Sequence, residues 1–203
     1  MTIQQVIDIA KYGELSQLSV KDDITGVLTY LNLGMLELYK RFPLKIEEHI
    51  ITLVEGQSIY DMPENYMWIV AAYEEAPDDT DIYVQPIPIN KEDDEKSVNT
   101  IGWAQVQVPL VTTGSFISII YVAAPSIYTD LDLAEQIAIP PQMLEPLLHY
   151  IAFKAHGTMD NGAAEDNVHY QRFEMSCDRI LAKGMFNQDD LYMTDRVNDR
   201  GFA

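Results

Sequence analysis

Residues 116–125 read Phe-Ile-Ser-Ile-Ile-Tyr-Val-Ala-Ala-Pro, and this stretch decides the fold class. Apart from Ser118, its residues are apolar or aromatic up to the closing proline. Because successive side chains of a strand point to opposite faces, both faces of this segment are hydrophobic. That pattern is typical of a strand at the centre of a sheet, buried on both sides. Residues 67–73 have the same character, so we predict two central strands.

Shorter extended segments accompany these two strands, at residues 50–54, 58–60, 83–89 and 101–108. Turn signals stand at Glu55-Gly56-Gln57 and at Thr112-Thr113-Gly114. Two prolines restrict residues 83–89 to the edge of a sheet, since proline cannot donate to the hydrogen-bond ladder. Residues 46–125 are therefore predicted to form an antiparallel β insertion.

Helical patterns stand on both sides of the insertion, and the four predicted helices span residues 2–11, 24–42, 141–156 and 163–183. In the first, apolar residues recur at the i, i+3, i+4, i+7 spacing of one helical face. Asp22 or Asp23 is the candidate N-cap of the second. Pro140-Pro141 introduces the third, and Gly184 follows the fourth as its C′ residue.

The predicted fold class is α+β. A four-helix frame, with two N-terminal and two C-terminal helices, carries an antiparallel β insertion and an extended C-terminal arm. Residues 1–45 are the first part of the helical frame, and residues 126–184 hold an acidic bridge and the second part. Residues 185–203 have no clear period, yet they contain more large apolar side chains than a disordered tail usually does. This arm either packs along its own domain or docks on a neighbouring chain.

The second predicted helix is apolar around most of its circumference. One apolar stripe runs from Ile24 to Phe42. A helix with a second apolar strip is buried on several sides or contacts another subunit. We therefore predict a subunit interface at the residues of the second strip, which are Tyr30, Leu33, Leu36 and Tyr39.

Charge is distributed unevenly along the chain, whose net charge is −19 at pH 7. Residues 46–153 contain eighteen Asp and Glu but only two basic residues, Lys91 and Lys96, whereas residues 1–45 are neutral overall. Binding to DNA needs Lys and Arg at the phosphates, so direct nucleic-acid binding is disfavoured. The acidity either provides solubility or keeps the surface from adhering to nucleic acid. No run of about 18 apolar residues occurs, so we expect no membrane contact.

No constellation of catalytic or metal-binding residues stands out. His149 and His156 are seven residues apart on one predicted helix, a rise of about 10.5 Å that is too long for two ligands of one zinc ion. Cys177 lies inside a predicted helix as a small core residue. The acidic groups at 78–81 and 130–132 lack the glycine and the terminal glutamate of an EF-hand loop. We predict no enzymatic activity, no metal and no cofactor.

Three motifs follow one another along the insertion and into the helix after it. Residues 56–66, Gly-Gln-Ser-Ile-Tyr-Asp-Met-Pro-Glu-Asn-Tyr, resemble the segment G-x-x-x-Y-x-L-P-x-D-F of the head-to-tail adaptor (connector, or head-completion) proteins of tailed phages, with Met62 for the leucine and Asn65 for the acid. Residues 121–125, Tyr-Val-Ala-Ala-Pro, resemble the Y-x-A-x-P that ends their last strand. Residues 139–150 then supply a proline-led entry into the third helix. The similarity extends over about residues 2–203.

The resemblance implies a structural virion protein without catalytic residues, assembled in the host cytoplasm and residing at the head–tail junction. Its copies would form a ring, usually dodecameric, below the portal protein, through which DNA passes without specific binding. The helical frame would pack subunit to subunit, and the insertion would face outward or toward the next tail component, a nozzle or tail-completion protein. The C-terminal arm would bind the portal protein, through Leu191, Tyr192, Met193, Arg196, Arg200 and Phe202.

A second class of function stays open at this point: a carbohydrate- or calcium-binding β module of a virion or cell-surface protein. Trp68, Trp103 and the tyrosines of the insertion would be its binding platform. A hydrolase with scattered carboxylates is a third interpretation. Acidic residues are so frequent here that their presence alone does not indicate a site.

Overall fold

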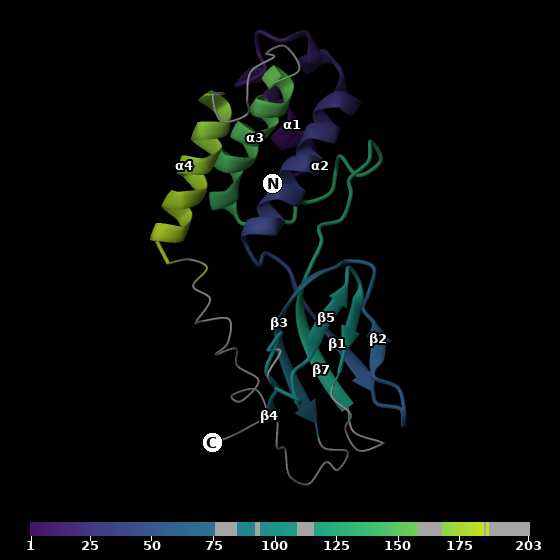
Figure 1. Cartoon of the computed structure of the whole chain (residues 1–203). Coiled ribbons are helices and arrows are strands. Elements are labelled where there is room, and N and C mark those ends of the chain that lie inside the picture. Colours follow the sequence, from purple (N-terminus) through teal and green to yellow (C-terminus); the bar gives the residue numbers. More distant parts are fainter. Residues whose placement is uncertain (76–84, 92–93, 109–115, 158–167, 185, 187–203) are drawn as a thin grey trace, which may run out of the picture. The chain divides into compact units, whose positions relative to one another are not determined.

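The computed structural model describes residues 1–75, 85–91, 94–108, 116–157, 168–184 and 186 (Figure 1). The chain divides into two compact units. The helical unit comprises Met1–Phe42 and the described residues from Pro125 to Phe186, and the β unit comprises Pro43–Ala124. The predicted α+β class is confirmed, with four described α-helices in one unit and antiparallel sheets in the other. Of the predicted C-terminal arm, residues 185–203, only Phe186 is described.

Helix α1 (Ile3–Tyr12) is delimited at both ends by its own sequence. Thr2 and Gln5 form a capping box, in which each side chain accepts a hydrogen bond from the backbone N–H of the other residue, at 3.3 and 2.9 Å. Gly13 ends the helix as its C-cap. The buried residues are those of the predicted face, Ile3, Val6, Ile7 and Ala10.

The bridge that follows the β unit also caps α1. The N–H groups of Ile3 and Gln4 donate to the carbonyls of Glu135 and Leu133, at 3.0 and 2.9 Å. These N–H groups belong to the first turn of the helix and have no partner within it. Two segments that lie on either side of the insertion in sequence are thereby joined in one unit.

Helix α2 (Ile24–Arg41) begins at Asp23, whose side-chain Oδ1 accepts from the Gly26 N–H at 3.0 Å, so the predicted N-cap is confirmed. Gly34 is buried and faces α3 (Leu144–Gly157). A Cβ at this position would lie 2.6 Å from Leu147 Cδ1. The missing side chain therefore permits the observed approach of the two helices, because packed interiors leave no spare volume.

Helix α3 follows a short 3-10 turn, η2 (Pro141–Met143). Pro146 lies in the first turn of α3, where a missing N–H costs no intrahelical hydrogen bond, so the helix continues through it. Helix α4 is described from Val168 to Ala182, and Gly184 follows with a positive φ of 67° as predicted.

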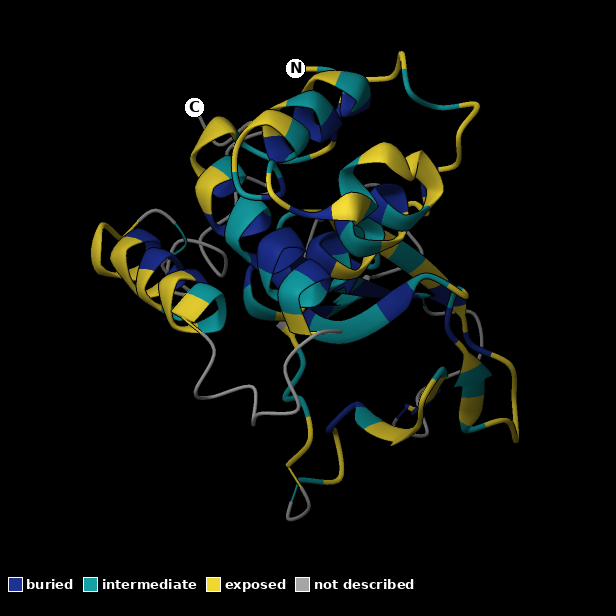
Figure 2. Ribbon diagram, turned by 90° about the horizontal axis from the view of Figure 1, so that it is seen from above, coloured by how far each residue is buried: buried dark blue, intermediate teal, exposed yellow. Residues whose placement is uncertain are grey.

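The sequence of the fourth helix predicts an inner face of Tyr170, Phe173, Cys177, Ile180 and Leu181. Phe173, Cys177 and Ile180 are buried, whereas Tyr170 is only half-buried and Leu181 is 50% exposed. Each helical residue is rotated by about 100° from the one before it, which carries Leu181 off the buried face. Elsewhere in the described helices, buried residues likewise gather on one side and exposed residues on the other (Figure 2).

The β unit contains two sheets, with strand orders β1-β7-β3-β4 and β2-β6-β5. The strands are β1 (Ile46–Thr52), β2 (Ile59–Asp61), β3 (Tyr66–Glu75), β4 (Gln85–Pro86), β5 (Asn99–Gly102), β6 (Gln105–Gln107) and β7 (Phe116–Ala123). Strand β7 pairs with both β1 and β3, and β3 lies between β7 and β4, so the prediction of two central strands is confirmed. Strand β4, which contains Pro86, lies at the edge as predicted.

Residues 101–108 were predicted to be one strand, and this prediction is wrong. The chain reverses at Trp103-Ala104, so that β5 and β6 form an antiparallel hairpin. Polar and apolar residues alternate in both strands of a hairpin, so this pattern does not show where the chain turns back. Gly102, at the end of β5, is the residue that indicates the turn. Strand β2 pairs with β6 rather than with β1. The predicted turn at 112–114 lies outside the described residues.

One buried hydrophobic cluster connects the two sheets. Ile51, Ile117 and Ile119 contribute from the four-stranded sheet, and Val106 contributes from the three-stranded sheet. Burial of each such side chain stabilises the fold by about 1.5–3 kcal/mol. The β unit therefore has a core of its own.

Arg41 joins the end of α2 to α4. Its guanidinium donates two hydrogen bonds to the Glu174 carboxylate, at 2.6 and 2.7 Å, and lies 4.6 Å from the centre of the Phe173 ring. The hydrogen bond from Arg41 is the main cause that lowers the pKa of Glu174. Bidentate pairs of this kind are the stronger class of protein ion pair.

Replacing Arg41 by alanine is expected to lower the free energy of unfolding of the helical unit by about 2–3 kcal/mol, because Glu174 loses both hydrogen bonds. Urea unfolding followed by helical circular dichroism measures this loss. Lys40→Ala is the matched control and should change stability by at most about 0.5 kcal/mol, because Lys40 is exposed and makes only a 3.5 Å contact with Glu37. Equal losses in the two variants would contradict the role given to Arg41.

Candidate functional site

The two insertion motifs meet at one carboxylate on β1. Glu47 Oε2 accepts hydrogen bonds from Asn65 Nδ2 at 2.7 Å and from the Tyr121 hydroxyl at 2.8 Å. Lys45 Nζ lies 2.7 Å from the other carboxylate oxygen. Asn65 belongs to the first motif and Tyr121 to the second. We call these four residues the Glu47 clasp.

The Glu47 clasp lies where the chain enters and leaves the β unit. Ile46 pairs with Val122 in the sheet, and the Ala123 N–H donates to the Lys45 carbonyl at 2.9 Å. The N–H of the next residue donates to the Asn65 carbonyl at 2.7 Å. Both motifs therefore help to close the base of the insertion.

The negative charge of Glu47 explains why residue 65 is an asparagine here, although the adaptor pattern has an acid at this position. The hydrogen bonds from Lys45, Asn65 and Tyr121, in that order, lower the pKa of Glu47 to about 2. Burial, followed by the hydrogen bond to Glu47, raises the pKa of Tyr121 to about 12. An aspartate at position 65 would set a second negative charge against Glu47. The amide instead donates to Glu47 and accepts from Tyr121 at 3.1 Å.

The predicted subunit interface on α2 is exposed only in part. Leu33 is 41% exposed, and Tyr30 and Leu36 are half-buried. Tyr39 is 1% exposed, and its hydroxyl donates to the Ala138 carbonyl at 2.8 Å. Tyr39 thus belongs to the core of its own unit, because the returning bridge covers it, and its assignment to a subunit interface is corrected. Tyr30, Leu33 and Leu36 are the residues of the predicted strip that stay at least partly exposed.

The portal-binding residues predicted in the C-terminal arm all lie outside the described residues; they are Leu191, Tyr192, Met193, Arg196, Arg200 and Phe202. Phe186 is described and packs against the end of α2. Its ring centre lies 5.3 Å from that of Phe42.

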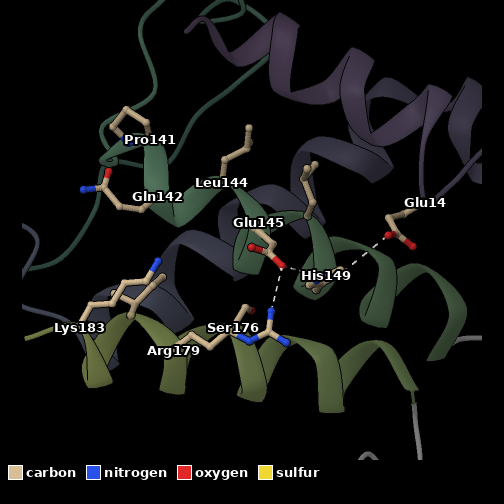
Figure 3. Close-up of a pocket in the computed structure, with 11 residues that line it drawn as sticks. Glu14, Pro141, Gln142, Leu144, Glu145, His149, Ser176, Arg179 and Lys183 are labelled. Carbon is tan, nitrogen blue, oxygen red and sulfur yellow. Dashed lines mark ion pairs between the residues drawn. The ribbon is translucent and has the colours of Figure 1, made fainter. Parts of the chain in front are cut away.

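A groove of about 540 Å³ lies between α3, η2 and α4 (Figure 3). Leu144, Leu148 and Ile180 give it an apolar floor. Arg179 of α4 and Lys183, the residue after α4, also line it, and Figure 3 shows the Arg179 guanidinium directed toward Glu145. The remaining lining residues are Glu14, Pro141, Gln142, Glu145, His149 and Ser176.

Three of the four histidines gather around Glu14 beside this groove. His149 Nδ1 and His169 Nδ1 lie 3.7 and 3.4 Å from the Glu14 carboxylate. The rings of His156 and His169 stack with centres 4.5 Å apart. Burial, followed by the neighbouring His156, lowers the pKa of His169, while Glu14 acts in the opposite direction. The sequence spacing of these histidines gave no sign that they meet.

The chemical candidates from the sequence do not converge in the described structure. No group of three or more His, Cys, Asp or Glu side chains within it could hold a metal ion. Cys177 is buried, and burial raises the pKa of its thiol to about 12, which leaves it unreactive. Asp132 accepts two hydrogen bonds from Thr129, at 2.7 and 2.8 Å. Trp68 lies on β3 of the four-stranded sheet and Trp103 in the turn between β5 and β6, and residues 78–81 lie outside the described chain.

Comparison with known proteins gives a family match. The sequence profile of the SU10 adaptor protein family matches residues 1–198. A solved structure, the neck of an empty GTA particle computed with C6 symmetry, contains a chain with 13% identity and a TM-score of 0.32, over 87% of this chain and 88% of that one. No curated protein matches the sequence. None of the described helices is long and apolar enough to cross a membrane.

A two-part α+β chain with adaptor motifs at the base of its insertion falls in the class of phage-type adaptor proteins. The chain belongs to the SU10 adaptor protein family. The resemblance to head-to-tail adaptors noted in the sequence is thereby confirmed.

Asn65→Asp is expected to destabilise the β unit by about 1–3 kcal/mol, because it removes the donor to Glu47 and adds a like charge. Glu47→Gln in the same chain should recover much of this loss, since an amide then again faces a carboxylate. Unfolding followed by tryptophan fluorescence reports the β unit selectively, as both tryptophans lie there. Glu64→Gln, at an exposed acid, serves as the control. A double variant less stable than Asn65→Asp would contradict this account of the clasp.

The helical unit is expected to lose stability as the pH falls below about 6.5, the ordinary pKa of histidine. The folded chain holds the pKa of His169 lower, so the unfolded chain binds the proton first and is favoured. Above this pH His169 is neutral in both the folded and the unfolded chain, so its protonation no longer lowers the free energy of unfolding. Nearby Glu14 opposes the effect, while His149, His156 and Arg172 reinforce it.

Urea unfolding between pH 7.5 and pH 5, with helical circular dichroism as the readout, measures this slope. His169→Phe keeps a stacked ring without a titrating proton and should flatten the slope. The control is His49→Phe, at the fourth histidine, which lies on β1 in the other unit. An unchanged slope in His169→Phe would show that other groups cause the pH dependence.

Proposed function

We propose that this chain is a non-enzymatic head-to-tail adaptor whose copies form a ring between the portal protein and the tail of a virion. The family match over residues 1–198 carries this proposal. The apolar strip of Tyr30, Leu33 and Leu36 supports it, because a ring needs surfaces on each copy for its neighbours. The ring is a dodecamer in this proposal, assembled in the host cytoplasm and retained at the head–tail junction.

The partners follow from the same proposal. The portal protein binds on one side, through the C-terminal arm, and a nozzle or tail-completion protein binds on the other. DNA passes through the ring without specific binding. The net charge of −19 suits such a conduit, because acidic walls repel phosphates and give the genome no place to adhere.

Native mass spectrometry and negative-stain microscopy of the chain, mixed with the portal protein of its own virus, test the assembly. The expected result is a closed ring on the portal, with one adaptor per portal subunit. A chain that stays monomeric and does not bind the portal at micromolar concentrations would overturn the proposal.

Truncation after Phe186 is expected to leave both units folded but to abolish portal binding. The cut is placed there because the Phe186 ring packs on Phe42 and contributes to the helical unit. Thermal unfolding checks the fold, and co-sedimentation with the portal checks binding. A truncated chain that unfolds, or that still binds the portal as tightly as the full chain, would contradict the role given to the arm.

A further inference from the structure

Among the described residues of the β unit, the aromatic side chain left most exposed is that of Trp103. Trp103 is 80% exposed at the turn between β5 and β6. It follows Gly102, and Ile101 just before it is 47% exposed. A tryptophan buries roughly 150–250 Å² when it finds a partner surface, so an exposed one at the tip of a hairpin could contribute much to the stability of an interface.

Strand β2, which pairs with the strand after this turn, carries an acidic side chain at Asp61. Asp61 on β2 pairs with Gln105, which follows the Trp103-Ala104 turn, and its carboxylate accepts from Gln105 Nε2 at 2.9 Å. The Met62 N–H donates to the Ala104 carbonyl at 2.8 Å, which holds β2 next to the turn. Glu64 is exposed two residues farther on. The hairpin tip is therefore an apolar projection with negative charge on one side.

The groove of the helical unit has the complementary character. Its apolar floor is Leu144, Leu148 and Ile180, and its volume of about 540 Å³ admits a large side chain. The α4 wall is basic, with Arg179 and Lys183 (Figure 3). Arg179 is 63% exposed, and its contact with Glu145, at 3.7 Å, is also largely exposed, which leaves the guanidinium available.

Glu14 and Glu145 also line the groove. Glu145 lies 3.7 Å from Arg179, and Glu14 lies beside His149 and His169, so both carboxylates already have partners. Arg179 and Lys183 are therefore the residues that would attract an acidic partner and orient it in the groove.

We propose that Trp103 of one copy docks in this groove of a neighbouring copy, with Asp61 and Glu64 facing Arg179 and Lys183. The inference rests on the proposed ring and names one of its contacts. Two different surfaces of the same chain meet in such a contact, which is the heterologous geometry that generates rings. A central tryptophan seated in a pocket is also the residue type that dominates binding energy at protein interfaces.

The main test is Trp103→Ala in the full chain, with oligomers counted by native mass spectrometry over a range of concentrations. Subunit association should weaken about 30-fold or more, the loss typical of a central aromatic anchor. The fold should be unaffected because the side chain is exposed. Tyr12→Ala is the matched control, as Tyr12 is an 86% exposed aromatic residue on α1.

Charge reversal tests the orientation. Arg179→Glu with Lys183→Glu should weaken association, and mixing this chain with an Asp61→Lys, Glu64→Lys chain should restore it. Lys11→Glu with Lys21→Glu changes the net charge equally on α1 and the following turn, and should have little effect. Failure of the mixed chains to associate would count against the proposed pairing.

Cross-linking decides whether the contact is between copies. A chain with Asp61→Cys is mixed with a chain carrying Lys183→Cys, and the native Cys177 can stay because it is buried. The expected product is a disulfide-linked pair of one chain of each kind. If the cross-link forms only when both substitutions are in one chain, the groove is filled within the monomer and the proposal is wrong.

The outcomes separate this inference from the proposed function. If Trp103→Ala assembles on the portal like the unaltered chain, the groove contact is wrong while the adaptor ring stands. If the unaltered chain forms no ring with or without the portal, both fail.

Discussion

A domain inserted into a helical unit must begin and end at the same place, and this constraint governs the β unit. The chain satisfies it by pairing β1 with β7, from Ile46 and Val122 at the base. The Glu47 carboxylate reinforces the junction through Asn65 and Tyr121. A partly buried carboxylate has to be fully hydrogen-bonded, so the identities of its neighbours follow from its position. The two adaptor motifs therefore contribute to one structural feature, the hydrogen-bonded base of the β unit, although they are far apart in sequence.

The helical unit meets the same constraint from its own side. The segment that returns from the β unit supplies carbonyls to the first turn of α1. It also exchanges two hydrogen bonds with the Asn32 side chain, at 2.8 and 2.9 Å, through the backbone of Tyr128. Arg41 then connects α2 to α4 through Glu174. The helices before the insertion and those after it therefore form one core, although 82 residues separate Phe42 from Pro125.

In an adaptor, the separate cores of the two units allow their surfaces to differ independently. The β unit has its own core, so its surface can change with little effect on the helices. Its solvent-facing side combines acidity with an exposed tryptophan, while the helical unit offers an apolar-floored groove and an apolar strip on α2. In the proposed ring, these two surfaces are the ones that would meet between neighbouring copies.

Local signals in the sequence by themselves determined the α+β class, the cap at Asp23, the buried face of α1 and the central strands. Each depends on residues within a few positions of one another, through helical period, capping or alternation. The tertiary structure alone decided the burial of Tyr39, the meeting of the two motifs at Glu47 and that of three histidines at Glu14. These features need contacts between segments tens of residues apart, and short-range patterns do not specify which distant segment will pack against which.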